Sequence, residues 1–145
     1  MTKSYRRDIL ELPLEFEVIC IEHAIPIERF EKAQSFLKQI RALLYTNECV
    51  FKQSEKNIMF DRQYSLSHEA KVNILKALTA EDCLEVGPNN NPRYPKSEVY
   101  TFIKSLNILS YGEEENVKLY IKMYLVEQKN SDVVIVISLH QEGMH

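Results

Sequence analysis

The chain has 145 residues, enough for a single domain that buries about two thirds of the surface exposed by its unfolded form. Its 18 basic side chains are outnumbered by 21 acidic ones, and the formal net charge of -3 argues against a protein that attracts nucleic acid or anionic membranes through its overall charge. Three scattered cysteines without a CxxC pair, and no long apolar stretch, indicate a cytoplasmic protein without a disulfide framework, a zinc site or a membrane span.

Residues 1 to 25 are expected to form an N-terminal extension of a main domain that covers residues 26 to 145. Within the extension, residues 14 to 22 alternate between apolar and polar side chains, which predicts an extra strand with Phe16 and Val18 buried. Such an edge strand can add to the sheet of its own chain or offer its edge to a partner.

A helix is predicted from about residue 26 to 46, because apolar side chains recur there at helical spacing behind Pro26. The apolar stripe consists of Ile27, Phe30, Ala33, Leu37, Ile40 and Leu44. Residues 48 to 64 carry short apolar runs separated by polar residues, which indicates extended or irregular backbone. Ser67 is a suitable N-cap for a second helix, because its hydroxyl oxygen can accept a free amide bond of the first turn.

The remaining chain is predicted to contain mainly strands. A short helical turn is expected after Thr79, and residues 87 to 95 are expected to form a loop, because three prolines and a glycine prevent regular structure there. Residues 97 to 106 have strand propensity, and two alternating runs at 117 to 127 and 132 to 140 predict a hairpin. The apolar side chains expected to share one buried face beneath the first helix include Leu119, Ile121, Ile135 and Ile137.

The other face of this hairpin gathers polar side chains. Because both apolar faces must lie on the same side of the sheet, two registers fit the short connecting loop. One register sets Tyr120 opposite His140 and Lys122 opposite Ser138, and the other sets Lys118 opposite His140 and Tyr120 opposite Ser138. Either register brings a histidine, a lysine and a tyrosine together on one exposed patch.

Several motifs occur in the order and spacing of a known family. They are L-T-A-E-D-C at residues 78 to 83, the G-P loop, S-E-V-Y-T-F-I-K at 97 to 104, V-K-L-Y-I-K-M at 117 to 123 and I-S-L-H at 137 to 140. With the linker V-F-x-x-x-x-K-N-I-x-F at residues 50 to 60, they make residues 36 to 140 resemble the MqsR-type toxins of bacterial type II toxin-antitoxin systems. Two positions depart from the family pattern: Tyr100 replaces the tryptophan of E-x-W-x-F-x-K, and Glu85 stands where some members have a lysine.

The resemblance implies an α+β fold similar to the RelE-type ribonucleases, with helices packed on one face of a twisted antiparallel sheet. It also implies a toxin that cleaves messenger RNA without a metal or other cofactor and that is neutralised by a cognate antitoxin protein. The family positions for RNA cleavage or binding correspond here to Tyr120, Lys122 and His140. The positions of the E-x-W-x-F-x-K motif correspond to Glu98, Tyr100 and Lys104.

Cleavage of RNA without a metal needs a base for the 2′-hydroxyl proton, positive charge beside the phosphorane and an acid for the departing 5′-oxygen. His140 suits the role of acid or base, because histidine side chains titrate near neutral pH. Lys122 can stabilise the phosphate charge, and Tyr120 can donate a hydrogen bond or stack on a base. Periodicity alone favours a strand-capping histidine and a solvated lysine, whereas the family pattern favours catalysis.

Arg93, Tyr94 and Lys96 lie in the proline-rich loop and are candidates for binding the phosphate backbone and stacking on a base, although surface loops carry such charges without function as well. The acidic net charge favours a second hypothesis, a non-catalytic interaction protein on the same fold that binds a protein or nucleic-acid partner. A monomer or weak dimer is expected under both hypotheses.

Overall fold

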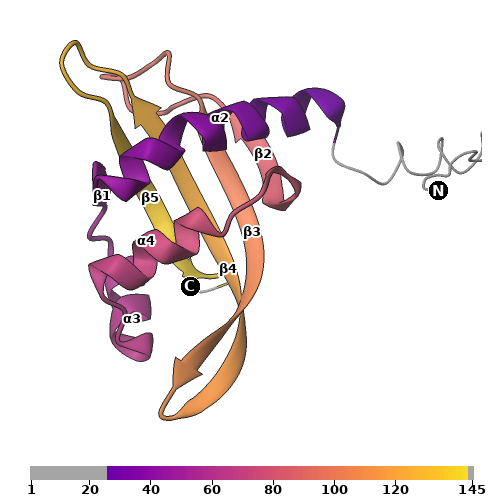
Figure 1. Cartoon of the computed structure of the whole chain (residues 1–145), viewed down its shortest axis with the longest axis vertical. Helices are drawn as coiled ribbons and strands as arrows, with labels where there is room; N and C mark the ends of the chain where they lie inside the picture. The colour runs from indigo at the N-terminus through magenta and orange to yellow at the C-terminus, as the bar shows by residue number, and fades with distance from the viewer. Residues whose placement is uncertain (1–25, 144–145) are drawn as a thin grey trace, which may run out of the picture.

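The computed structural model describes residues 26 to 143, which form an α+β fold with three helices on one face of an open five-stranded sheet (Figure 1). The strand expected at residues 14 to 22, with Phe16 and Val18, lies outside the described residues. In chain order, the elements are α2 (Ile27–Tyr45), β1 (Cys49–Phe51), α3 (Glu55–Tyr64), α4 (His68–Lys76), the 3-10 turn η2 (Ala80–Asp82), β2 (Cys83–Gly87), β3 (Val99–Ser110), β4 (Glu113–Val126) and β5 (Val133–Gln141).

The core lies between the helices and one face of the sheet, which we call the helix-covered face. Helix α2 has nearly its predicted span and buries most of the expected apolar stripe, whereas Ile27 in its first turn is exposed. Strand β4 buries every second residue of its apolar run: Val117, Leu119, Ile121 and Met123 are all inaccessible to solvent. Because each large apolar side chain contributes about 1.5–3 kcal/mol when fully buried, this alternation fixes which face of β4 meets the helices.

The strand order is β1-β5-β4-β3-β2, and neighbouring strands are antiparallel except for β1, which runs parallel to β5. The sheet is therefore mixed, and the expectation of a purely antiparallel sheet is wrong at this edge. Strand β1 has only three residues, and an apolar run this short has no periodicity from which its direction or its partner can be predicted.

The hairpin of β4 and β5 adopts one of the two expected registers near the end of β5, where Tyr120 pairs with His140 and Lys122 with Ser138. A β-bulge follows, because the next pair joins Met123 to Val136 and skips Ile137. The register expected from alternation therefore holds only for the final residues of β5.

The bulge leaves Ile137 as an extra residue in β5 and changes which side chains of this strand reach the core. Val134 and Val136 are fully buried on the helix-covered face, while Ile135 and Ile137 are half-buried on the opposite face. The expectation that Ile135 and Ile137 share the core beneath the helices is wrong, because an inserted residue reverses the alternation of everything before it.

Helix α3 was also not expected, since its residues were predicted to be extended or irregular. The Ser54 hydroxyl caps it by accepting a hydrogen bond from the backbone N–H of Asn57 at 3.3 Å. Phe60 and Tyr64 pack into the core. The predicted cap of α4 is confirmed, because the Ser67 hydroxyl accepts from the Ala70 amide at 3.1 Å. No helix among the described residues is long and apolar enough to cross a bilayer.

Strands β3 and β4 form the longest hairpin and project past the helices at the lower end of the sheet (Figure 1). They are joined by a two-residue turn in which Tyr111 and Gly112 both have positive φ, 54° and 82°. Two consecutive left-handed residues are typical of turns whose twist matches the flanking strands.

Candidate active site on the open face of the sheet

The face of the sheet opposite the helices, here called the open face, carries the residues expected to be catalytic. Tyr120 and Lys122 alternate with the core residues of β4 and therefore lie on this face, and His140 pairs with Tyr120 from β5. The rings of Tyr120 and His140 stack with centroids 5.5 Å apart and planes 27° from parallel. The structure thus brings the three predicted catalytic residues together on two adjacent strands.

His140 is only 8% exposed, and its imidazole has a defined hydrogen bond. Its Nδ1 lies 3.0 Å from the carbonyl oxygen of Gln141. A carbonyl only accepts, so Nδ1 carries the hydrogen, and Nε2 is the ring nitrogen that can act as a proton acceptor. This tautomer leaves His140 oriented to accept a proton through Nε2.

His140 lines an open cavity of about 570 Å³, which we call the histidine cavity. The cavity lies between the end of β5 and the first turn of α3, and the residues around it include Lys52, Lys56, Tyr120, Ser138, His140 and Glu142. The lysines supply positive charge, and the first turn of α3 adds the positive end of the helix dipole. The carboxylates of Glu55 and Glu142 offset part of this charge.

A second cavity of about 480 Å³, here the loop cavity, adjoins the first, since Lys52 and Ile137 line both. It lies between the loop at residues 88 to 92 and strands β3, β4 and β5, and Lys122 also lines it. Its apolar lining consists mainly of Val99, Tyr124, Ile135 and Ile137. Apolar and aromatic surface beside cationic groups is what a planar, charged ligand such as a nucleotide needs.

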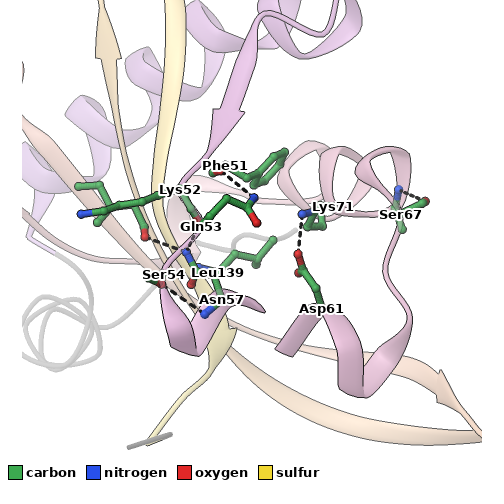
Figure 2. Close-up of polar contacts among 11 residues, drawn as sticks. Phe51, Lys52, Gln53, Ser54, Asn57, Asp61, Ser67, Lys71 and Leu139 are labelled. Carbon is green, nitrogen blue, oxygen red and sulfur yellow. Dashed lines mark hydrogen bonds and ion pairs between the residues drawn. The ribbon is translucent and has the colours of Figure 1, made fainter. Parts of the chain in front are cut away.

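Asn57, in the first turn of α3, holds the edge of β5 beside both cavities (Figure 2). Its side-chain amide donates to the carbonyl oxygens of Lys52 at 2.8 Å and Ile137 at 3.0 Å, and its Oδ1 accepts from the Leu139 N–H at 3.0 Å. Strand β1 ends just before this point, where the Lys52 N–H donates to the Val136 carbonyl at 2.9 Å. Asn57 therefore continues the hydrogen bonding of the β5 edge across the bulge, after β1 has stopped.

A third cavity, here the end cavity, lies between α2 and the loop after β2 and collects five of the predicted RNA-binding residues. These are Arg93, Tyr94, Lys96, Glu98 and Tyr100. The Tyr94 ring packs against the Tyr124 ring at a centroid distance of 5.9 Å, and Tyr124 also lines the loop cavity. The end cavity is therefore linked to the open face through these two aromatic rings.

Tyr100 and Lys104 lie on the helix-covered side of β3 and not beside His140. The Tyr100 ring stacks on Phe36 with centroids 3.9 Å apart and planes 11° from parallel, and its burial raises the pKa of the phenol, with a further contribution from Glu98. Lys104 forms an ion pair of 3.2 Å with Asp82. Both residues thus have structural contacts that account for their positions.

Glu98 also has a partner within the chain, because it accepts a hydrogen bond of 3.0 Å from Lys32 of α2. This hydrogen bond, together with the charge of Glu98, raises the pKa of Lys32. The pair is exposed and ties the loop before β3 to α2, so its contribution to stability is small.

Two residues of the site were not found from the sequence, Lys52 and Asn57. Both come from the segment predicted to be irregular, and Asn57 bonds to a strand residue 82 positions away. Asn57 belongs to the K-N-I part of the linker motif, whereas Lys52 falls at an unspecified position of that motif and has no sequence signal of its own.

Among residues 26 to 143, no three histidine, cysteine, aspartate or glutamate side chains form a group suited to hold a metal ion. No family model, no curated protein and no solved structure matches this chain.

Proposed function

We propose that this chain is a metal-independent endoribonuclease toxin of a type II toxin-antitoxin system, with an MqsR-type, RelE-like fold, acting on messenger RNA in the cytoplasm and neutralised by a cognate antitoxin. The observation that supports this most is the buried imidazole of His140, which is held in one tautomer and stacked on Tyr120 in a cavity lined by lysines. An oriented proton acceptor beside cationic groups suits chemistry at a phosphate.

In the proposed reaction, Nε2 of His140 takes the proton of a ribose 2′-hydroxyl as the 2′-oxygen forms a bond to phosphorus. The bond from phosphorus to the 5′-oxygen then breaks, and that oxygen takes a proton from a lysine ammonium or from water. Lys122 stabilises the extra negative charge of the phosphorane, and Tyr120 keeps the imidazole in its orientation. The products carry a 2′,3′-cyclic phosphate and a free 5′-hydroxyl.

The arrangement of the cavities supports a single-stranded substrate. A base next to the cleaved bond has an apolar surface to lie on in the loop cavity, while the phosphate remains near His140 and Lys122. Arg93, Tyr94 and Lys96 line the end cavity, where they are placed to contact a neighbouring nucleotide.

The test is cleavage of a defined RNA by purified protein in the presence of EDTA, with the chemistry of the new ends read by mass spectrometry. The wild type is expected to produce 2′,3′-cyclic phosphate ends. His140→Ala and Lys122→Ala are each expected to lower the rate about a hundred- to ten-thousandfold, because each removes one positioned group. Lys129→Ala, in the exposed loop between β4 and β5, is the matched control and is expected to cut normally.

Circular dichroism on each variant establishes that the fold is retained. Equal cutting by wild type and His140→Ala would remove His140 from catalysis. Absence of cutting by antitoxin-free wild type would favour the second candidate, a non-catalytic interaction protein on the same fold. The structural use of Glu98, Tyr100 and Lys104 supports this alternative, because these residues are occupied by intramolecular contacts.

A further inference from the structure

Lys52 directly follows β1 and lines both the histidine cavity and the loop cavity. It therefore shares the first cavity with His140 and the second with Lys122. Its side chain is exposed, and within residues 26 to 143 no carboxylate forms an ion pair with it. Figure 2 shows it extending away from the Asp61–Lys71 ion pair on the helix-covered side. The Lys52 ammonium is thus available to a ligand of the open face.

The backbone that carries Lys52 is fixed on both sides. Its N–H donates to the Val136 carbonyl at 2.9 Å, and its carbonyl accepts from the side-chain amide of Asn57 at 2.8 Å. The first bond joins Lys52 to the bulged segment of β5 that also carries His140. The second joins it to the side chain of Asn57 in α3, which in turn bonds to Ile137 and Leu139 of β5. Because these hydrogen bonds fix the backbone from which the Lys52 side chain extends before any ligand arrives, less ordering of this segment is needed on binding.

The local charge makes this lysine important. Glu55 and Glu142 line the histidine cavity and oppose an anion there, while Lys52, Lys56 and, from the adjoining cavity, Lys122 favour one. The positive excess is small, and loss of Lys52 would cancel it. The start of α3, a ten-residue helix, adds the positive end of its dipole on the same side.

We propose that Lys52 is a phosphate-binding residue, and that the phosphate occupies the histidine cavity between the imidazole of His140 and the ammonium group of Lys52. The identity of the ligand as an RNA phosphate rests on the proposed function, whereas anion binding by Lys52 does not. The test therefore uses inorganic phosphate as the probe and treats RNA cleavage as a separate measurement.

Isotope-labelled full-length protein is titrated with inorganic phosphate at constant ionic strength, and the imidazole signals of His140 and His68 are followed by NMR. His68 lies on α4, beside Phe51 on the helix-covered side, and serves as the internal control. The wild type is expected to show a saturable shift at His140 and none at His68. Lys52→Ala is expected to weaken the binding by about tenfold or more, since a charge-assisted hydrogen bond is lost.

Lys52→Arg is expected to retain most of the phosphate affinity, and Lys129→Ala is expected to leave it unchanged. No phosphate-dependent shift at His140 in the wild type, or equal affinity in wild type and Lys52→Ala, overturns the proposal. If phosphate binds through Lys52 and the wild type does not cut RNA, the phosphate site stands and the proposed function fails. If RNA is cut, Lys52→Ala is expected to lower the rate at least a hundredfold and Lys52→Arg to restore part of it.

Discussion

Replacing Asn57 with alanine is expected to destabilise the whole domain, although Asn57 lies at the edge of the sheet. The change removes three hydrogen bonds and leaves the Leu139 N–H and the carbonyls of Lys52 and Ile137 without their partner. Asn57 is itself only 6% exposed and Leu139 is buried, so water does not replace the bond to the Leu139 N–H without a rearrangement of α3. The bulged end of β5 is therefore expected to loosen, and with it the position of His140.

The magnitude follows from the groups left unpaired. A buried donor or acceptor without a partner costs about 1–3 kcal/mol. The Leu139 N–H is expected to cost the most, because the residue is buried, while the carbonyls of Lys52 and Ile137 adjoin open cavities where water can approach. The expected loss is about 2–4 kcal/mol in the free energy of unfolding, and a loss of about 3 kcal/mol corresponds to a fall in Tm of roughly 10 °C for a domain of this size.

The assay is urea unfolding followed by far-UV circular dichroism, with Asn107→Ala as the matched control. Asn107 also has a side-chain hydrogen bond, accepted from Asn116 at 2.9 Å, but this pair lies on the exposed part of the β3–β4 hairpin. Its loss is expected to change stability by less than about 0.5 kcal/mol. Equal effects of Asn57→Ala and Asn107→Ala would refute the reasoning that burial makes the Asn57 hydrogen bonds important.

Asn57→Asp gives a sharper version of the same experiment. The new carboxylate still accepts from the Leu139 N–H, but its second oxygen faces the carbonyl oxygens of Lys52 and Ile137, to which the amide donated. Burial and these carbonyls raise the folded-state pKa of the introduced carboxyl above its unfolded value of about 3.9. The destabilisation is therefore expected to grow as pH rises through the folded-state pKa, and to be smaller at pH 5 than at pH 7. A penalty independent of pH contradicts this orientation of the amide.

Two further predictions concern a buried hydroxyl group in β3 and a turn residue with positive φ. Thr101→Val is expected to leave the free energy of unfolding unchanged or raise it by about 1 kcal/mol, because the Thr101 hydroxyl is buried and has no hydrogen-bond partner among the described residues. Clear destabilisation in urea unfolding would mean that the hydroxyl has a partner. Tyr111→Asn is expected to raise the free energy of unfolding by about 0.5–1 kcal/mol, because Tyr111 is 98% exposed with φ of 54° and asparagine tolerates this conformation better before Gly112. A lower Tm in that variant would show that the tyrosine ring stabilises the turn.

The parts of the fold predicted correctly are those with a long and uninterrupted period. Helix α2 and strand β4 are of this kind, since each has several apolar residues at one spacing. Strand β5 has an equally clear alternation, yet the side chains before the bulge at Ile137 face the other way. The bulge contacts Asn57 of α3, a residue far away in the chain, and the alternation contains no sign of it. Helix α3 itself was missed because its ten residues bury only Asn57, Phe60 and Tyr64, too few to establish a helical period.

The same distinction applies to the candidate site. Pairing of neighbouring strands brings Tyr120, Lys122 and His140 together, and strand alternation was sufficient to predict this patch. Lys52 reaches it through the parallel pairing of β1 with β5, which joins segments far apart in the chain and has no local signal. Tyr100 has the spacing of a site residue, but its burial against Phe36 could be learned only from the packing of α2 on the sheet.

Strand β5 follows all the other described strands in the chain, yet its place in the sheet is between β1 and β4. A chain emerging from the ribosome therefore presents β1, Lys52 and Asn57 long before the strand with which they pair. Non-local pairing of this kind is formed late and slowly, because the intervening chain must be ordered first. Under the proposed function, a nascent chain is harmless to the message from which it is being translated, and cutting begins only after synthesis has delivered His140.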